Sequence, residues 1–240
     1  MVDARTERRS RFAAPSIKST RSSAVGRLTR ALWCFIAVAA AALSTGCCPP
    51  KAVGPVTEAK HVRFVHTVTP GVLIRGAEPD ERGMRELRDT FGVKTVVNFN
   101  NMTSKSGAKR AAQLGLNYLP LPDNPLFECG DEERYLAFMK CIRDAKSNGQ
   151  LPVYVHCDTG LDRVGVAVGV YRIVEEGWDA DRALAELHGY QRCFFALVFF
   201  RYDGILHKVE RTREEWRSRL NQTPSPPLQR NAPTTRPTKP

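Results

Sequence analysis

The segment from residue 151 to residue 176 constrains the fold more than any other part of the chain. A short apolar run, Leu151–Val155, leads into a polar loop with Cys157 and Arg163, and an apolar run, Val164–Val174, follows the loop. The first run has the length of a buried strand, and the second is apolar nearly all round, as a buried helix is. Because a strand, a loop and a helix in this order build α/β folds, we expect a mostly parallel central sheet flanked by helices.

The loop has the size and composition to bind one phosphate group. Its backbone N–H groups can surround an anion, and the N-terminus of the following helix faces the same point. Arg163 can contact two phosphate oxygens at once, and the same positive groups favour a nucleophilic thiolate at Cys157. The expected contacts to phosphate come from six further residues: His156, Asp158, Thr159, Gly160, Leu161 and Asp162. The alternative is a purely structural loop with a buried thiol and no phosphate site.

The pattern His156-Cys157-x-x-Gly160-x-x-Arg163 resembles the signature of the cysteine-dependent tyrosine and dual-specificity phosphatases. Residues 73–79 and 92–98 resemble bacterial and fungal members of the dual-specificity branch, and the resemblance covers roughly residues 62–190. It implies a dual-specificity-phosphatase-like fold and hydrolysis of phosphomonoesters through a cysteinyl-phosphate intermediate at Cys157. It implies no metal and no cofactor.

Val164 departs from the family pattern, which usually has Ser or Thr directly after the arginine. That hydroxyl helps the thiolate to leave in the second step, so its absence affects turnover more than phosphate binding. A phosphate-binding pseudophosphatase module without turnover is therefore a second hypothesis. A rhodanese-like sulfur transferase is a third, and the spacing of Gly160 and Arg163 argues against it.

The resemblance also implies a general acid on a loop some thirty residues before the cysteine. Asp123, beside Pro122, lies 34 residues before Cys157 and is the first candidate. It could instead be an ordinary turn residue. Asp162 is the competitor, because the lipid phosphatases called myotubularins have a similar Gly-x-Asp-Arg ending. Two outside candidates are Glu128 and Asp131.

The acidic residues of the loop bear on the substrate. Asp158 and Asp162 should repel a densely charged substrate. This favours a phosphoprotein, phosphorylated on Tyr or on Ser/Thr, or a lightly phosphorylated small molecule. An inositol-phosphate or phospholipid phosphatase is the alternative.

The basic charge of the chain lies at its two ends. The formal net charge is +11, of which residues 1–46 carry +6 and residues 219–240 carry +4. Residues 47–218 carry only +1. A nucleic-acid-binding domain usually has a basic stripe, so we expect no nucleic-acid partner.

The N-terminal segment has the pattern of an export signal. Arg27 and Arg30 precede a 13-residue apolar run, Ala31–Leu43, which is short for a membrane span. Residues 43–47 resemble a bacterial lipoprotein cleavage site, which implies lipidation of Cys47; an uncleaved anchor is the alternative. Either anchor predicts a location in the cell envelope, membrane-bound and facing outside the cytoplasm.

These patterns divide the chain into four parts. We expect a basic leader and signal over 1–46, a linker over 47–60, a phosphatase-like domain over 61–220 and a disordered Pro-rich tail over 221–240. The expected strands are 62–67, 72–75, 93–99, 118–121 and 151–156. The expected helices are 79–91, 105–114, 131–146, 164–176, 179–188 and 205–220, the last a surface helix with Trp216. Three further cysteines fit no metal-ligand spacing and leave buried thiols or one disulfide open: Cys129, Cys141 and Cys193.

Overall fold

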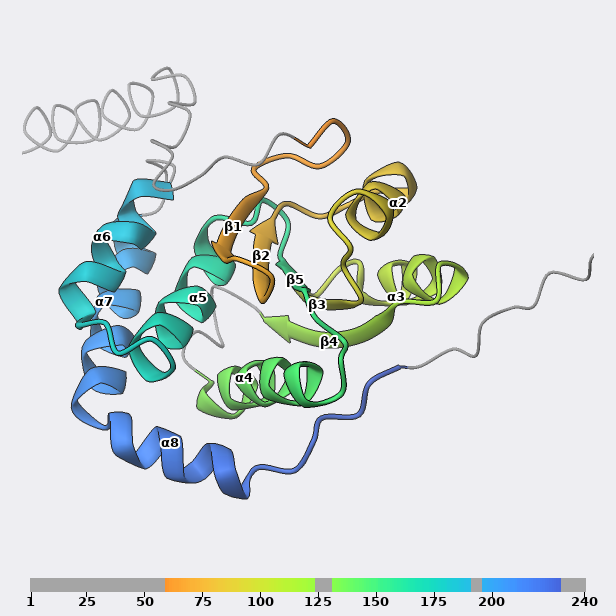
Figure 1. Cartoon of the computed structure of the whole chain (residues 1–240). Coiled ribbons are helices and arrows are strands. Elements are labelled where there is room, and N and C mark those ends of the chain that lie inside the picture. The colour runs from red at the N-terminus through yellow and green to blue at the C-terminus, as the bar shows by residue number, and fades with distance from the viewer. Residues whose placement is uncertain (1–58, 124–130, 191–195, 230–240) are drawn as a thin grey trace, which may run out of the picture. The chain divides into compact units, whose positions relative to one another are not determined.

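A five-stranded sheet forms the centre of the computed structural model, which describes residues 59–123, 131–190 and 196–229 (Figure 1). The strands are β1 (His66–Thr69), β2 (Leu73–Gly76), β3 (Thr95–Asn100), β4 (Asn117–Asp123) and β5 (Val153–His156). Their order is β1-β2-β5-β3-β4, with β1 antiparallel to β2 and the other pairs parallel. The predicted mostly parallel α/β sheet is confirmed.

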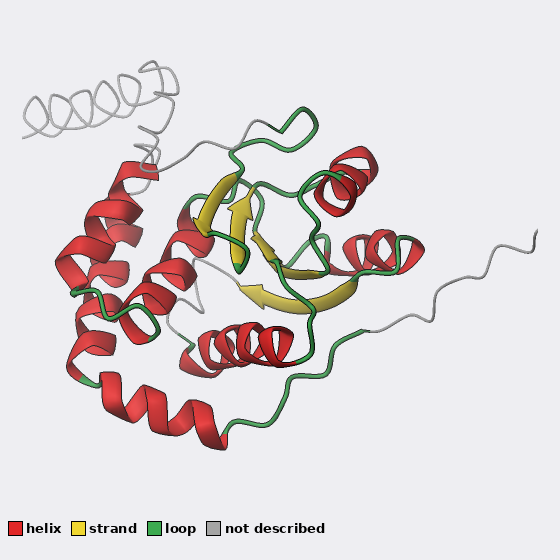
Figure 2. Cartoon of the chain, in the orientation of Figure 1, coloured by secondary structure: helices red, strands yellow, loops and turns green. Residues whose placement is uncertain are grey.

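Seven helices of the described residues surround the sheet (Figure 2). They are α2 (Glu81–Asp89), α3 (Ser104–Gln113), α4 (Glu132–Ser147), α5 (Asp162–Val174), α6 (Ala180–Tyr190), α7 (Ala196–Arg211) and α8 (Arg213–Gln222). Asp80 caps α2 by accepting a hydrogen bond of 2.7 Å from the Gly83 N–H, and Asp131 caps α4 in the same way through the Glu133 N–H.

Two sequence predictions about elements were wrong. The expected strand at 62–67 begins only at His66, because Phe64 has a φ of 57°, which an extended strand cannot adopt. The expected single helix at 205–220 is two helices that meet at Thr212. Trp216 does not lie on the surface but is 1% exposed, because α8 turns this ring into the core.

The sheet separates two apolar cores, because successive side chains of a strand point to opposite faces. Val97 of β3 and Val155 of β5 lie in the core formed with α4 to α8. Val96 and Tyr154, their neighbours in the sequence, lie in the core formed with α2 and α3. Figure 1 shows these two groups of helices on either side of the strands. A parallel sheet covered on both faces exposes its strand ends, where the loops gather.

Helix α5 is the most buried helix of the described residues and holds the predicted phosphate loop at its start. Gly165 leaves room for the Leu187 side chain of α6, and Gly169 leaves room for Leu206 of α7. A methyl group at either glycine would overlap the facing leucine. The close contacts keep α5 fixed against two helices, which in turn fixes the loop at its N-terminus.

The chain after α8 runs back to the sheet. Gln229 pairs with Tyr118 of β4 through two backbone hydrogen bonds of 2.9 and 3.3 Å, and Leu228 packs against the core. Residues 221–229, assigned from the sequence to a disordered tail, thus contain the end of a helix and a segment bonded to β4. The leader over 1–46, most of the linker and residues 230–240 lie outside the described residues. Among the helices described, none is both long and apolar enough to span a bilayer.

Candidate active site

The loop from Cys157 to Arg163 lies at the carboxyl end of β5, beside the carboxyl ends of β2, β3 and β4. Its backbone is tied to the chain after β2, because the Glu78 N–H donates to the Asp158 carbonyl oxygen over 3.0 Å. Loop and neighbouring strand ends therefore form one site, as expected for a ligand crevice of an open parallel sheet.

Cys157 lies at the base of the loop and is 1% exposed. The Gly160 N–H donates to its Sγ over 3.2 Å. A backbone donor aimed at sulfur stabilises the thiolate, which is the nucleophilic form. The loop thus curls back over the cysteine as the sequence predicts.

Gly160 is required for this turn. Its φ is +75°, in the left-handed region that favours glycine. A methyl group at Gly160 would also overlap the backbone of Gly76 at the end of β2. Of the remaining loop residues, Leu161 is buried, Thr159 and Asp162 are half-buried, and Asp158 is exposed.

Arg163 extends from the first turn of α5 toward β3 and β4. Its Nη1 donates to the Phe99 carbonyl oxygen and to the Asp123 carbonyl oxygen, both over 3.2 Å. These contacts hold the guanidinium beside the loop, at the strand ends. The guanidinium and the N-terminus of α5 therefore bring positive charge to the same side of the sheet.

His156 is buried, and its Nδ1 lies 3.2 Å from the Cys157 carbonyl oxygen, to which it can donate. Its ring stacks on Tyr154, whose hydroxyl donates to the Ala77 carbonyl oxygen over 2.6 Å. Burial above all, with the charges of Arg110 and Arg163, lowers the pKa of His156 to about 4, against the opposing effect of the hydrogen bond to the Cys157 backbone. The ring is neutral at pH 7 and fits the expected role of orienting the loop.

The first general-acid candidate, Asp123, ends β4 and is 2% exposed. Its backbone contact to Arg163 places it in the site, yet its Oδ1 lies 2.9 Å from Nη1 of Arg134. An ion pair with a guanidinium favours the ionised carboxylate, whereas an acid must be protonated. Asp131 caps α4 and also faces Arg134, at 3.4 Å, and Glu128 lies outside the described residues.

The competitor, Asp162, is the first residue of α5. Burial raises its pKa, while the positive charges of Arg163 and Arg75 lower it. A carboxyl group with a raised pKa holds its proton up to a higher pH than an ordinary one, which suits a proton donor. The structure therefore brings both acid candidates to the loop. Asp123 forms an ion pair with Arg134, whereas burial is the main influence on Asp162.

Two residues that the sequence interpretation gave no role also hold the loop. Arg75 of β2 is buried and donates to two carbonyl oxygens of the loop. Glu78 accepts hydrogen bonds from Asn100 and Thr103 and an ion pair from Arg110, which ties the loop side to α3. The sequence feature that could have pointed to a role for Arg75 is a single arginine inside a short apolar strand.

Besides Cys157, the described residues contain one cysteine. Cys141 is a buried free thiol on α4, and burial raises its pKa to about 12. Cys129 and Cys193 lie outside the described residues, so the question of a disulfide among the three stays open. Across residues 59–123, 131–190 and 196–229, no group of three His, Cys, Asp or Glu side chains could hold a metal ion.

In sequence, the chain is similar to the dual specificity protein phosphatase TpbA of Pseudomonas aeruginosa. Identity is 32% over 118 residues with TpbA of one strain and 30% over 115 residues with that of another. The matches cover 49% and 48% of this chain and 50% and 49% of the relatives. The chain thus spans about half the length of the curated relatives it matches. No family model matches the chain.

In structure, the chain is similar to crystal structures of P. aeruginosa TpbA, alone and as a variant with pTyr. The two superpose with TM-scores of 0.51, at 23% and 21% identity, over 66% and 70% of this chain and 99% and 100% of theirs. The catalytic domain of the S. cerevisiae PP-IP phosphatase SIW14 gives a TM-score of 0.51 at 12% identity, over 72% of this chain and 99% of its own. The described residues therefore have the fold of the dual-specificity and tyrosine phosphatases.

Proposed function

We propose that this protein hydrolyses phosphomonoesters through a cysteinyl-phosphate intermediate. The observation that carries the proposal is the loop itself, in which the Gly160 N–H donates to Cys157 Sγ while Arg163 stands at the facing strand ends. The phosphatase-like fold and the sequence similarity to a dual specificity protein phosphatase support it.

In the first step, the Cys157 thiolate attacks phosphorus. A sulfur–phosphorus bond forms, the bond to the leaving oxygen breaks, and that oxygen takes a proton from a carboxylic acid. The loop N–H groups and the Arg163 guanidinium stabilise the charge on the transferring phosphoryl group. In the second step, water attacks phosphorus, gives a proton to the same carboxylate, and the thiolate leaves.

Two carboxyl groups compete for the role of acid. We infer that Asp123 serves as the acid only after it leaves Arg134, whereas burial already raises the pKa of Asp162. Loss of the acid should reduce the rate of hydrolysis more for esters with poor leaving groups than for esters with good ones. The role is decided by kcat/KM of Asp123→Asn and Asp162→Asn with 4-nitrophenyl and phenyl phosphate, because kcat/KM reports the first step even where the second step limits turnover. The acid is the residue whose variant loses more activity on phenyl phosphate than on 4-nitrophenyl phosphate. If both variants lose equally on the two esters, neither residue is the acid.

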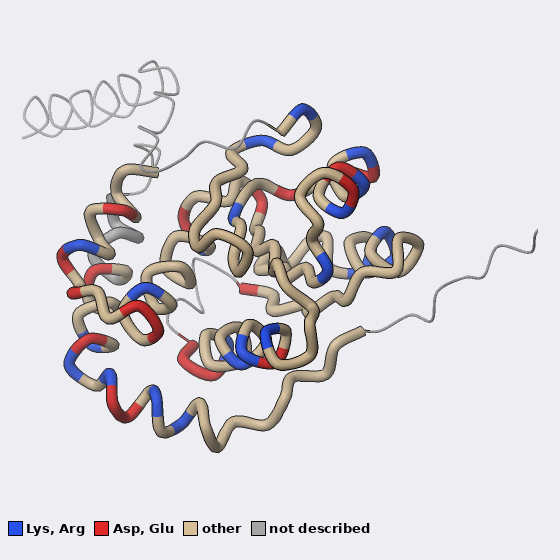
Figure 3. Tube along the Cα trace, viewed as in Figure 1, with Lys and Arg blue, Asp and Glu red and all other residues tan. Residues whose placement is uncertain are grey.

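The substrate class that we propose is a phosphoprotein, phosphorylated on Tyr or on Ser/Thr. The name of the matched relative, a dual specificity phosphatase, supports this class, and so does the acidic exposed Asp158 in the loop. An inositol-phosphate or phospholipid substrate is the alternative. Figure 3 shows positive and negative residues mixed over the outer helices, as on an ordinary protein surface.

For the location, we propose that the chain is exported and anchored through a lipid on Cys47. The basic residues before the apolar run and the lipoprotein-like residues 43–47 support this proposal. An exported catalytic thiolate is open to oxidation, so assays need a reductant.

The activity is tested by hydrolysis of 4-nitrophenyl phosphate with the purified full chain. Cys157→Ser should abolish hydrolysis because a serine hydroxyl is not ionised at neutral pH. Arg163→Lys should cost on the order of 100-fold, because an ammonium group cannot make the two-pronged contact. Wild-type protein that binds inorganic phosphate but shows neither a burst nor turnover would instead be the phosphate-binding module.

A further inference from the structure

Arg75 lies under the phosphate loop, and no carboxylate of the described residues bonds to it. The side chain comes from β2, is 1% exposed, and is far from Cys157 in the sequence. Its Nη2 donates to the Gly160 carbonyl oxygen over 2.8 Å and to the Leu161 carbonyl oxygen over 2.9 Å. Its Nη1 has no hydrogen-bond partner among the described residues.

The bond to Gly160 fixes the direction of one peptide group, and the bond to Leu161 adds to the hold on a second, whose carbonyl oxygen also accepts from the Gly165 N–H of α5 over 2.9 Å. In a trans peptide, the N–H of one residue points away from the carbonyl oxygen of the residue before it. Because the Gly160 and Leu161 carbonyl oxygens face Arg75, the N–H groups of Leu161 and Asp162 face the opposite side. That side is the bowl of the loop, where phosphate would bind.

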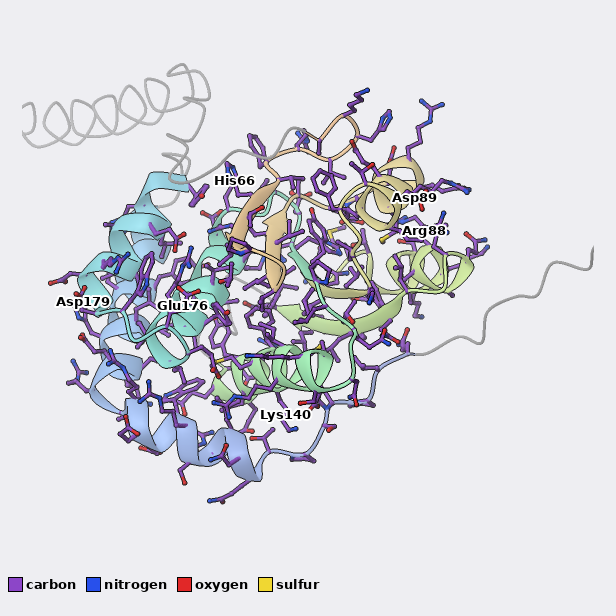
Figure 4. All side chains as sticks on the ribbon, in the orientation of Figure 1. His66, Arg88, Asp89, Lys140, Glu176 and Asp179 are labelled. Atoms are coloured by element: carbon purple, nitrogen blue, oxygen red, sulfur yellow. The ribbon has the colours of Figure 1, made fainter. Side chains whose placement is uncertain are left out.

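No carboxylate of the described residues forms an ion pair with Arg75, although Glu186 and Asp162 act on it electrostatically. Among the carboxylates, Glu186 has the largest electrostatic influence on Arg75, but both of its oxygens accept from Arg172, over 2.9 and 3.0 Å. The Arg75 guanidinium instead lies over the Tyr190 ring, 4.3 Å from its centroid, and the His66 ring packs against the same tyrosine in a T-shaped arrangement. Figure 4 places His66 on β1, the strand beside β2.

A buried cation without a paired anion lowers the stability of the folded protein. Burial lowers the pKa of Arg75, and the electrostatic influence of Tyr190, Glu186, Cys157 and Asp162 opposes this. Arginine stays charged in proteins, so a full positive charge lies near the cysteine. A thiolate or a bound phosphate would supply the missing anion.

We propose that Arg75 is a positioning residue of the phosphate loop, which turns the Leu161 and Asp162 N–H groups toward the phosphate and balances the negative charge at Cys157. The proposal rests on the proposed function. It extends the phosphate site to a residue of β2 outside the Cys157–Arg163 loop, and it assigns Arg75 no contact with the substrate.

The test compares Arg75→Lys, which keeps the charge but loses the fork, with Arg75→Met, which loses both. Arg172→Lys is the matched control, because Arg172 is also mostly buried and stacked on an aromatic ring, Trp178, but does not touch the loop. Two quantities are measured on the purified full chain. They are the inhibition constant of inorganic phosphate and the rate of Cys157 alkylation by iodoacetamide as a function of pH.

We expect the inhibition constant of phosphate to rise about tenfold in Arg75→Lys and by more in Arg75→Met. A tenfold rise corresponds to a loss of about 1.4 kcal/mol in the binding free energy of phosphate. The pH midpoint of alkylation should move upward in Arg75→Met. Arg172→Lys should match the wild type in both. Circular dichroism confirms the fold of each variant, and if Arg75→Met does not fold, Arg75→Lys decides.

Folded Arg75 variants that match the wild type in both measurements would overturn the proposal. Equal losses in Arg172→Lys would overturn it too, because the effect would then be a general loosening of the cluster. If the wild type binds no phosphate and hydrolyses no ester, the proposed function is wrong, but this result alone does not decide the role of Arg75. The alkylation profile still decides about Arg75 in that case, because it needs no substrate.

Discussion

Val164 is buried in the first turn of α5, directly after Arg163, and offers no hydroxyl to the sulfur. In the proposed second step, Cys157 must leave as a thiolate, and a hydroxyl donor would stabilise it. The Gly160 N–H still donates to the sulfur, so the step should be slowed and not stopped. Breakdown of the cysteinyl phosphate should therefore limit the rate.

The change Val164→Thr tests this expectation. Wild-type protein should release about one equivalent of 4-nitrophenol in a fast burst before slow turnover, as covalent catalysis with slow release requires. Val164→Thr should raise the steady-state rate and leave the burst rate nearly unchanged. Stopped-flow absorbance measures both phases, and Val164→Ala controls for volume. A wild type without a burst, together with no gain in Val164→Thr, would leave the valine as plain core packing.

His156 makes stability depend on pH. Its ordinary pKa is 6.5 and its folded pKa is about 4, so the folded state favours the neutral ring. The stability that this provides is present above pH 6.5 and is lost as the pH falls toward 4. Between pH 6.5 and 5 the loss should be about 2 kcal/mol in the free energy of unfolding.

Urea unfolding of the wild type and of His156→Gln at pH 7, 6 and 5 measures this loss. The free energy of unfolding should fall more steeply with decreasing pH in the wild type than in His156→Gln. The matched control is His61→Gln, since His61 is exposed. Parallel slopes for wild type and His156→Gln would mean that His156 does not titrate as a buried ring.

At the scale of elements, the sequence predicted best what is local. The β5–loop–α5 unit follows from neighbouring residues, because the apolar runs and the glycine turn lie within one short segment. The break between α7 and α8 lies at Thr212, without Gly or Pro to signal it, and depends on where Trp216 packs. The bond from Arg75 to Gly160 joins residues 85 positions apart, and no local pattern reports it.

The packing of α8 gives a prediction at this scale. The Trp216 ring lies in the core with α4 and α5, so Trp216→Ala should lower the free energy of unfolding by about 3–5 kcal/mol. Glu214→Ala on the exposed face of α8 is the control and should change it by less than about 0.5 kcal/mol. Urea unfolding followed by circular dichroism measures both. A surface helix, as predicted from the sequence, would give similar small values for the two variants.

At the scale of the whole molecule, the described residues account for the phosphatase-like domain but not for its location. The matched relatives are covered over only about half their length. The described helices include none that could cross a membrane. The proposed location rests on the sequence pattern before and at Cys47, which is therefore the residue to test.

Cys47→Ser in the full chain tests the lipid anchor. The wild type should pellet with bacterial membranes and incorporate labelled palmitate, because acyl chains on a cysteine bind membranes strongly. Cys47→Ser should lose the label, whereas the neighbouring Cys48→Ser should keep both label and membrane binding. If Cys47→Ser remains in the membrane with its leader uncleaved, the apolar run Ala31–Leu43 is the anchor instead. A wild type found wholly in the soluble fraction would contradict both forms of anchoring. Export would then be tested separately, by whether the leader is cleaved.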